Sequence, residues 1–203
     1  RLFRTVLEMA YARTEAKLVF PDESSEEKPD AYVRHGRYVV MLECKDTDVA
    51  DVHQSEFDYV NFLKELRKKH VRNDKGDPKS VAQLDRNIRE LMAGEFPKEL
   101  YGSGKPKDMW VLPVLVCDGY LYSAPGVNEL LNRFYQENST SKSAPLTVLT
   151  IEYLFRKIVD LHKESLLDVL QRYNCERGRR RRKFRSRPTP ENAFELFASI
   201  EEV

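Results

Sequence analysis

The fold of this chain is decided by the stretch KPDAYVRHGRYVVMLECK, residues 28–45. Two runs rich in β-branched and aromatic residues flank a turn at His35-Gly36, where glycine adopts positive φ easily. We therefore predict a tight β-hairpin. A two-residue turn at this point places Asp30, near the start of the first strand, opposite Met41 on the second.

The second strand of this hairpin has two different faces, because side chains alternate along a strand. We predict that the apolar face packs on the core and that the other face lines a cleft, since charged groups are costly to bury unless they are paired or bound to a metal. Asp30 then shares a face with Glu43, one diagonal step and roughly 7–8 Å away by Cα. The apolar face comprises Tyr38, Val40, Leu42 and Cys44, and the other comprises Val39, Met41, Glu43 and Lys45.

Two carboxylates and an ammonium group at a strand end favour metal-dependent hydrolysis of phosphodiesters. Carboxylate oxygens are hard ligands of the kind that Mg²⁺ prefers. A bound Mg²⁺ polarises a phosphate and helps to deprotonate water. The Lys45 ammonium is placed to position that water or to stabilise the charge that develops on phosphorus.

These residues also carry a family resemblance. Pro29-Asp30, twelve intervening residues and Glu43-Cys44-Lys45 resemble the PD-(D/E)xK phosphodiesterase superfamily, which has the restriction-endonuclease-like fold. The order of predicted elements over roughly residues 1–125 agrees: a helix, a short strand, the Asp-bearing strand, the Glu/Lys-bearing strand, a helical segment and a buried strand. Our leading hypothesis is therefore a Mg²⁺-dependent hydrolase, a nuclease or endonuclease that cleaves DNA, with DNA versus RNA and endo- versus exonucleolytic cleavage left open by the sequence.

The resemblance also implies roles for individual residues. Asp30 and Glu43, with the Cys44 backbone carbonyl, would bind Mg²⁺ or Mn²⁺, and Lys45 would assist the water. Family members often add an acidic residue from the first helix, for which Glu8 and Glu15 are candidates. Some place a glutamine on the helix after the motif, here Gln83. The chain departs from the pattern at 57–70, where an additional polar helix precedes Gln83.

The rest of the chain predicts an α/β architecture, a mixed sheet core flanked by helices, with a helical C-terminal extension. We expect helices within 2–16, 57–70, 77–94 and 125–136, a buried strand at 109–117, and a hairpin turn at Asp118-Gly119. Residues 149–173 read as two helices that meet near Lys163. The predicted domains are residues 1–138, nuclease-like, and residues 145–203, helical.

A basic segment at 177–187 follows these helices, whereas the preceding body is slightly acidic. This layout is typical of proteins that bind polyanions, and we expect the segment to contact a nucleic-acid backbone, that of DNA. Its charged residues are also consistent with a solvated surface run or a nuclear-import signal. They are Arg177, Arg179, Arg180, Arg181, Arg182, Lys183, Arg185 and Arg187.

Two other functions remain open. The chain can be a catalytically inactive nucleic-acid-binding module, or a protein-interaction module whose C-terminal helices dock a partner or a second copy. No apolar run approaches the roughly 20 residues of a membrane span, so we expect no membrane association. Three widely spaced cysteines favour a reducing, intracellular setting, cytoplasmic or, in a eukaryote, nuclear.

Overall fold

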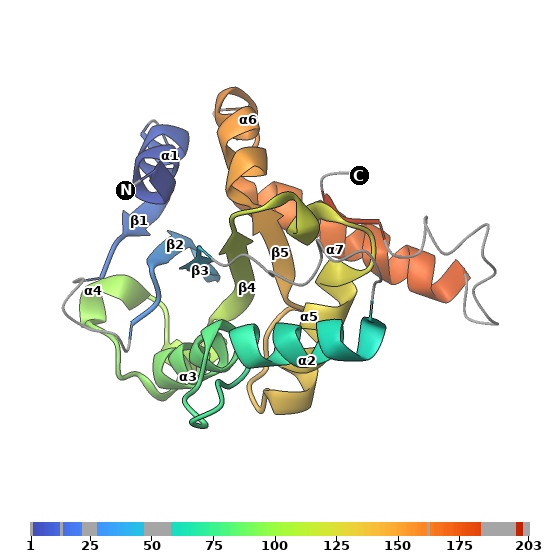
Figure 1. The fold of residues 1–203 in the computed structure, drawn as a ribbon. Helices are drawn as coiled ribbons and strands as arrows, with labels where there is room; N and C mark the ends of the chain where they lie inside the picture. Colours follow the sequence, from blue (N-terminus) through green and yellow to red (C-terminus); the bar gives the residue numbers. More distant parts are fainter. Residues whose placement is uncertain are drawn as a thin grey trace.

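The chain has a mixed α/β fold in which helices cover both faces of a five-stranded sheet (Figure 1). The computed structural model describes residues 2–12, 14–21, 28–46, 58–161, 163–183 and 198–200. The elements in chain order are α1 (Leu2–Tyr11), β1 (Lys17–Val19), β2 (Ala31–His35), β3 (Tyr38–Lys45), α2 (Tyr59–His70), α3 (Ser80–Ala93), α4 (Lys98–Tyr101), η2 (Pro106–Asp108), β4 (Trp110–Cys117), η3 (Tyr120–Ser123), α5 (Val127–Asn138), β5 (Thr147–Thr150), α6 (Ile151–Leu161) and α7 (Leu166–Lys183).

The sheet has the order β1-β2-β3-β4-β5. β2 is antiparallel to β1 and β3, whereas β4 runs parallel to β3 and to β5. The predicted hairpin is formed by β2 and β3, but its turn lies one residue later than predicted. His35 pairs with Tyr38, so Gly36 and Arg37 form the turn, with Gly36 at φ +58°. The pairing moves by two residues, and a shift of two keeps every side chain on its predicted face.

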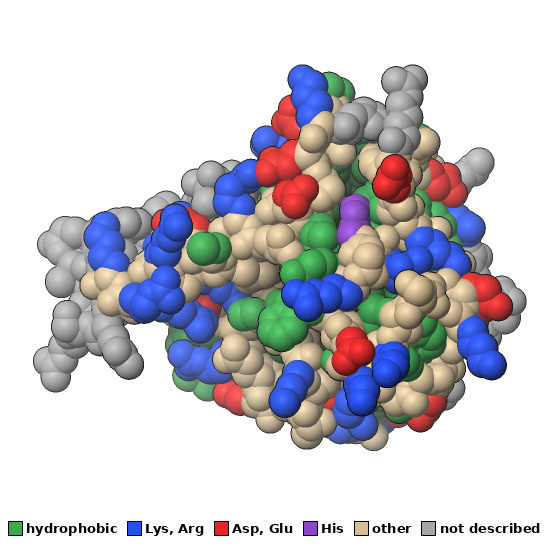
Figure 2. Space-filling view, turned by 180° about the vertical axis from the view of Figure 1, so that it is seen from behind, with side chains coloured by type: hydrophobic (Ala, Val, Ile, Leu, Met, Phe, Trp, Pro, Cys, Tyr) green, Lys and Arg blue, Asp and Glu red, His purple; other side chains and the backbone are tan. Residues whose placement is uncertain are grey.

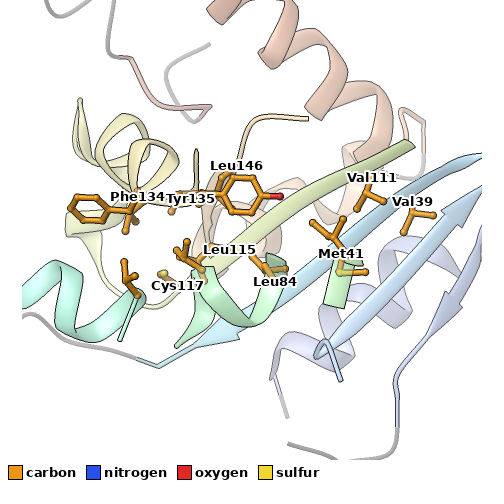
Figure 3. Packing of buried hydrophobic residues seen from close by; sticks show 14 of the residues in the cluster. Val39, Met41, Leu84, Val111, Leu115, Cys117, Phe134, Tyr135 and Leu146 are labelled. Atoms are coloured by element: carbon orange, nitrogen blue, oxygen red, sulfur yellow. The ribbon is translucent and has the colours of Figure 1, made fainter. Parts of the chain in front are cut away.

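Both faces of β3 are buried, which corrects the prediction of an apolar face and an open one. Val39 and Met41 pack among side chains of α2, α3 and α5, as Figure 3 shows for the cluster around Leu84 and Leu115. The opposite face, with Val40, packs among side chains of α1, α6 and α7. The continuous apolar run 39–42 suits a strand covered on two sides.

The helix α3 covers the Val39/Met41 face and positions the candidate site. Its buried apolar residues recur at helical spacing, as the sequence predicts. The helix ends at Gly94, whose left-handed conformation (φ +85°) lets its N–H reach the last carbonyls. The buried apolar residues of this helix are Val81, Leu84, Ile88 and Leu91.

The C-terminal part of the chain corrects two predictions. The segment Thr147–Thr150 lies in the region predicted to be helical, with its first helix beginning at residue 149, but it is the strand β5. Because α6 and α7 then pack on the same sheet, residues 145–183 share the core of the preceding residues and are not a separate helical extension. The predicted hairpin turn at Asp118-Gly119 leads instead into the short helix η3. The two long helices do meet near Lys163, as predicted.

Within the part of the chain that the structure describes, side chains form hydrogen bonds with the main-chain groups at the outer edge of β5. The N–H groups of Leu146 and Val148 donate to the side-chain oxygens of Asn132 and Asn128, both on α5. Arg177 of α7 donates to the Leu146 carbonyl at 3.1 Å. None of the described helices is both long and apolar enough to cross a lipid bilayer.

Candidate active site

The structure brings the two predicted carboxylates to one place. Continuing the β2–β3 register past Ala31 and Leu42 puts Asp30 directly opposite Glu43, where the sequence predicted a diagonal step. The neighbouring pair Tyr32 and Met41 belongs to the core beneath α3, so the carboxylates two residues further along face α3 as well. Glu43 is only 4% exposed, whereas Asp30 is open to solvent. The pair therefore joins a buried carboxylate to an accessible one.

Pro29 and Cys44 give this strand end its particular chemistry. The same register places Pro29 opposite Cys44, and proline has no N–H to donate to the carbonyl of a facing residue. The Cys44 N–H instead donates to Asp30 Oδ2 at 2.6 Å and fixes that carboxylate. The N–H and C=O of a strand residue point to the same neighbouring strand. The Cys44 carbonyl is therefore directed toward the Pro29–Asp30 side of the strand pair, where Pro29 supplies no ladder donor, a point that sequence analysis missed.

Lys45 completes the group. Its Nζ lies 2.7 Å from Glu43 Oε1. Burial raises the pKa of Glu43 to about 7; the Lys45 charge lowers it and the Asp30 charge raises it. Burial alone would lower the pKa of Lys45, but the charge of Glu43 and its hydrogen bond outweigh burial and raise that pKa. Lys45 therefore stays cationic at neutral pH, while Glu43 titrates in that range.

The donor set suits a hard cation that keeps much of its water. Among the described residues, no three His, Cys, Asp or Glu side chains are grouped so as to hold a metal ion. Two carboxylates and a carbonyl are nevertheless a fitting set for Mg²⁺, which usually binds through one or two carboxylates plus waters and substrate phosphates. The Cys44 thiol is not part of this set, because burial raises its pKa to about 12.

Comparison with known proteins does not place this chain in a family. A scan against protein-family models, a search of curated proteins and a search of solved structures each find no match. The case for chemistry at the acidic pair therefore rests on the residues themselves.

The two acidic candidates on the first helix are not brought to the site. α1 packs on the face of the sheet opposite to α3. Glu8 is exposed on this helix and pairs with Arg4 at 3.4 Å, and Glu15 lies exposed just after it. Neither supplies a third carboxylate beside Asp30 and Glu43, because helix and carboxylate pair occupy different layers.

Gln83 lies in the first turns of α3, the helix that packs on β3, with its Oε1 buried and without a hydrogen-bond partner among the described residues. Sequence analysis missed Arg86, one turn further on, whose charge lowers the pKa of Glu43. The spacing of three residues between Gln83 and Arg86, on one helix flank, was the available signal.

The residues of the predicted basic segment differ in their surroundings. Arg177 is 5% exposed and packs against Tyr173, so it is a core residue and not a nucleic-acid contact. The residues from Arg179 to Lys183 form the last turns of α7, which extend beyond the body as a basic end (Figure 2). Part of this charge is paired internally, since Arg181 contacts Glu129. Arg185 and Arg187 lie outside the described residues.

The titration of Glu43 predicts how Mg²⁺ binding depends on pH. Mg²⁺ needs the ionised carboxylate, so binding displaces a proton from Glu43 when the pH is below about 7. We expect the affinity for Mg²⁺ to rise about tenfold from pH 6 to pH 8, most of it below pH 7, and then to level off. Isothermal titration calorimetry in buffers of different ionisation enthalpy measures both the affinity and the released proton. In Glu43→Gln the pH dependence should disappear; a wild-type affinity that is constant over this range contradicts the assignment.

Proposed function

We propose that this chain is a Mg²⁺-dependent nuclease that hydrolyses phosphodiester bonds in DNA. The observation that carries the proposal is the convergence of Asp30 and Glu43 across one strand pair, with Lys45 Nζ 2.7 Å from Glu43. A buried carboxylate with a pKa near neutrality, beside a charged partner, is also a feature that is common at functional sites.

The topology supports a restriction-endonuclease-like fold as part of the same proposal. The order implied by the resemblance corresponds to α1, β1, β2, β3, then α2 and α3, then β4. β4 lies beside β3 and parallel to it, so the helices between them form a crossover connection. α2 fits the additional helix that sequence analysis places before Gln83.

The roles of the residues follow from their surroundings. Asp30 and Glu43, with the Cys44 carbonyl, would hold Mg²⁺, which polarises a bound phosphate and acidifies a bound water. The Cys44 N–H holds Asp30 in position. The Lys45 side chain is 28% exposed, so its ammonium group can reach a phosphate from solvent and stabilise the negative charge that builds up during attack.

Cleavage of plasmid DNA tests the proposal. We expect the wild-type chain to nick and linearise supercoiled plasmid in Mg²⁺ or Mn²⁺ but not in EDTA. Asp30→Asn removes one ionised ligand, and we expect cleavage to fall on the order of 10²-fold. Asp160→Asn is the matched control, because Asp160 is an exposed carboxylate on α6 that pairs with Lys157. The proposal fails if wild type does not cleave in either metal, or if Asp30→Asn cleaves as fast as Asp160→Asn.

A catalytically inactive nucleic-acid-binding module is the second candidate, favoured by the basic end of α7. Contacts of this end with phosphates would weaken steeply as salt rises and would carry no sequence preference. DNA binding that is lost when Arg179, Arg180, Arg181 and Arg182 are neutralised, but is unaffected by Mg²⁺ or by Glu43→Ala, would select this function over the nuclease.

A further inference from the structure

One turn of α3 carries a concentration of buried polar atoms without partners. Asn87 is 1% exposed, and neither atom of its amide group has a hydrogen-bond partner among the described residues. The same holds for Gln83 Oε1 and for Arg86 Nε, whose nearest carboxylate oxygen, on Glu90, is 3.8 Å away. Burying such groups unpaired costs stability, so each one calls for an explanation.

These three side chains lie on the flank of α3 that faces the acidic pair. Positions 83, 86 and 87 are spaced by three and four residues and so neighbour one another on the helix surface. α3 packs directly on β3, the strand that carries Glu43 and Lys45. Arg86 Nε lies 3.8 Å from one carboxylate oxygen of Glu90, and the Nζ of Lys28, two residues before Asp30, lies 3.8 Å from the other. The unpaired atoms are thus beside the candidate site.

The acidic pair needs additional positive charge nearby if it is to bind a phosphodiester. When no cation is bound, Asp30 and Glu43 repel a phosphodiester, and Lys45 offsets only one of these two negative charges. Arg86 supplies a second cation whose Nε–H makes no hydrogen bond among the described residues, and guanidinium groups suit phosphate oxygens well. The Asn87 amide supplies a further N–H donor in a desolvated position, where hydrogen bonds are stronger.

From this arrangement we infer that Arg86 and Asn87 form a phosphate-binding subsite on α3, which holds a non-bridging oxygen of a DNA phosphodiester next to the acidic pair. The inference rests on the proposed function, because it takes its substrate class from it. It also explains why the Asn87 amide has no partner: its hydrogen-bonding groups would be paired only when the substrate is bound. Such a group lowers the stability of the free protein, a cost that is common where function requires it.

Two substitutions test the subsite through binding and stability together. Asn87→Leu removes the unpaired amide, so we expect a higher melting temperature but about tenfold weaker binding of a short DNA duplex, measured in Ca²⁺. Arg86→Gln should also weaken binding about tenfold. Thr147→Val is the matched control for Asn87→Leu, because Thr147 Oγ1 is equally buried and unpaired but lies on β5. Arg89→Gln is the control for Arg86, since Arg89 pairs with Asp85 on the other flank of α3.

The outcomes separate the subsite from the nuclease proposal. Weakened binding by both variants, with both controls binding as wild type, supports the subsite even if wild type does not cleave DNA in Mg²⁺. Wild-type affinity in Asn87→Leu and Arg86→Gln overturns the subsite, even if wild type does cleave. A wild-type chain that does not bind the duplex in Ca²⁺ also overturns it. If Asn87→Leu fails to fold, the affinity of Arg86→Gln against that of Arg89→Gln decides.

Discussion

Replacing Lys45 with alanine is expected to lower the rate of DNA cleavage in Mg²⁺ by about 10³-fold. The substitution removes the ammonium group that lies 2.7 Å from Glu43 and faces the candidate metal position. It has a second effect, because the Lys45 charge lowers the pKa of Glu43. Without Lys45 that pKa rises further, and less Glu43 is ionised at neutral pH.

Measuring the rate at two pH values separates these effects. At pH 7 both contribute, whereas at pH 8.5 with saturating Mg²⁺ the Glu43 carboxyl is mostly ionised and only the loss of the ammonium group remains. Lys157→Ala is the control, because Lys157 forms an exposed ion pair with Asp160 in a different layer of the molecule. A Lys45→Ala rate within threefold of wild type at pH 8.5 would show that Lys45 takes no direct part in the chemistry.

The second large effect expected is a loss of stability in acid that originates at His70. This side chain is fully buried, with Nδ1 3.0 Å from Ser80 Oγ and Nε2 2.9 Å from Tyr122 OH. Burial, aided by the charges of Lys69 and Lys45, lowers its pKa from 6.5 to about 3. Between these two values the unfolded chain binds a proton that the folded chain does not, so stability falls as the pH falls from 6.5 toward 3.

The shift corresponds to roughly 4 to 5 kcal/mol over that range. Urea unfolding followed by circular dichroism at a series of pH values measures it. His70→Gln has no titrating ring but keeps an amide for Ser80 and Tyr122, and its stability should depend less on pH in this range. His35→Gln is the control, because His35 is only partly buried and its pKa is lowered less strongly. Parallel pH profiles for wild type and His70→Gln would rule out this origin.

The residue pattern predicts the hairpin and its faces but not the burial around it. A change in register moves a side chain to the other face of the sheet only when the shift is an odd number of residues. The turn lies one residue later than predicted, which shifts the pairing by two residues, so Asp30 and Glu43 still share a face. The sequence analysis did not predict that the face with Glu43 is buried. Residues 39–42 are all apolar, and such a continuous apolar run is typical of a central strand that is covered on both faces. That sign was present in the sequence.

Other features depend on contacts that no local pattern contains. β5 has four residues and leads directly into α6, so its apolar residues merge with the helical period that follows. Arg177 lies within a run of arginines, and nothing in the run distinguishes the one that turns inward. The subsite residues Arg86 and Asn87 acquire meaning only once α3 is seen to lie on β3.

The edge of β5 limits how copies of this chain can assemble. Asn128, Asn132 and Arg177 already bond the main-chain groups there that an incoming strand would use. These bonds would have to break before a second copy could extend the sheet on that side. The opposite edge is β1, only three residues long, which offers few main-chain bonds. We therefore expect self-association of the described body to depend on side-chain surfaces more than on backbone pairing, so its strength should respond to surface substitutions.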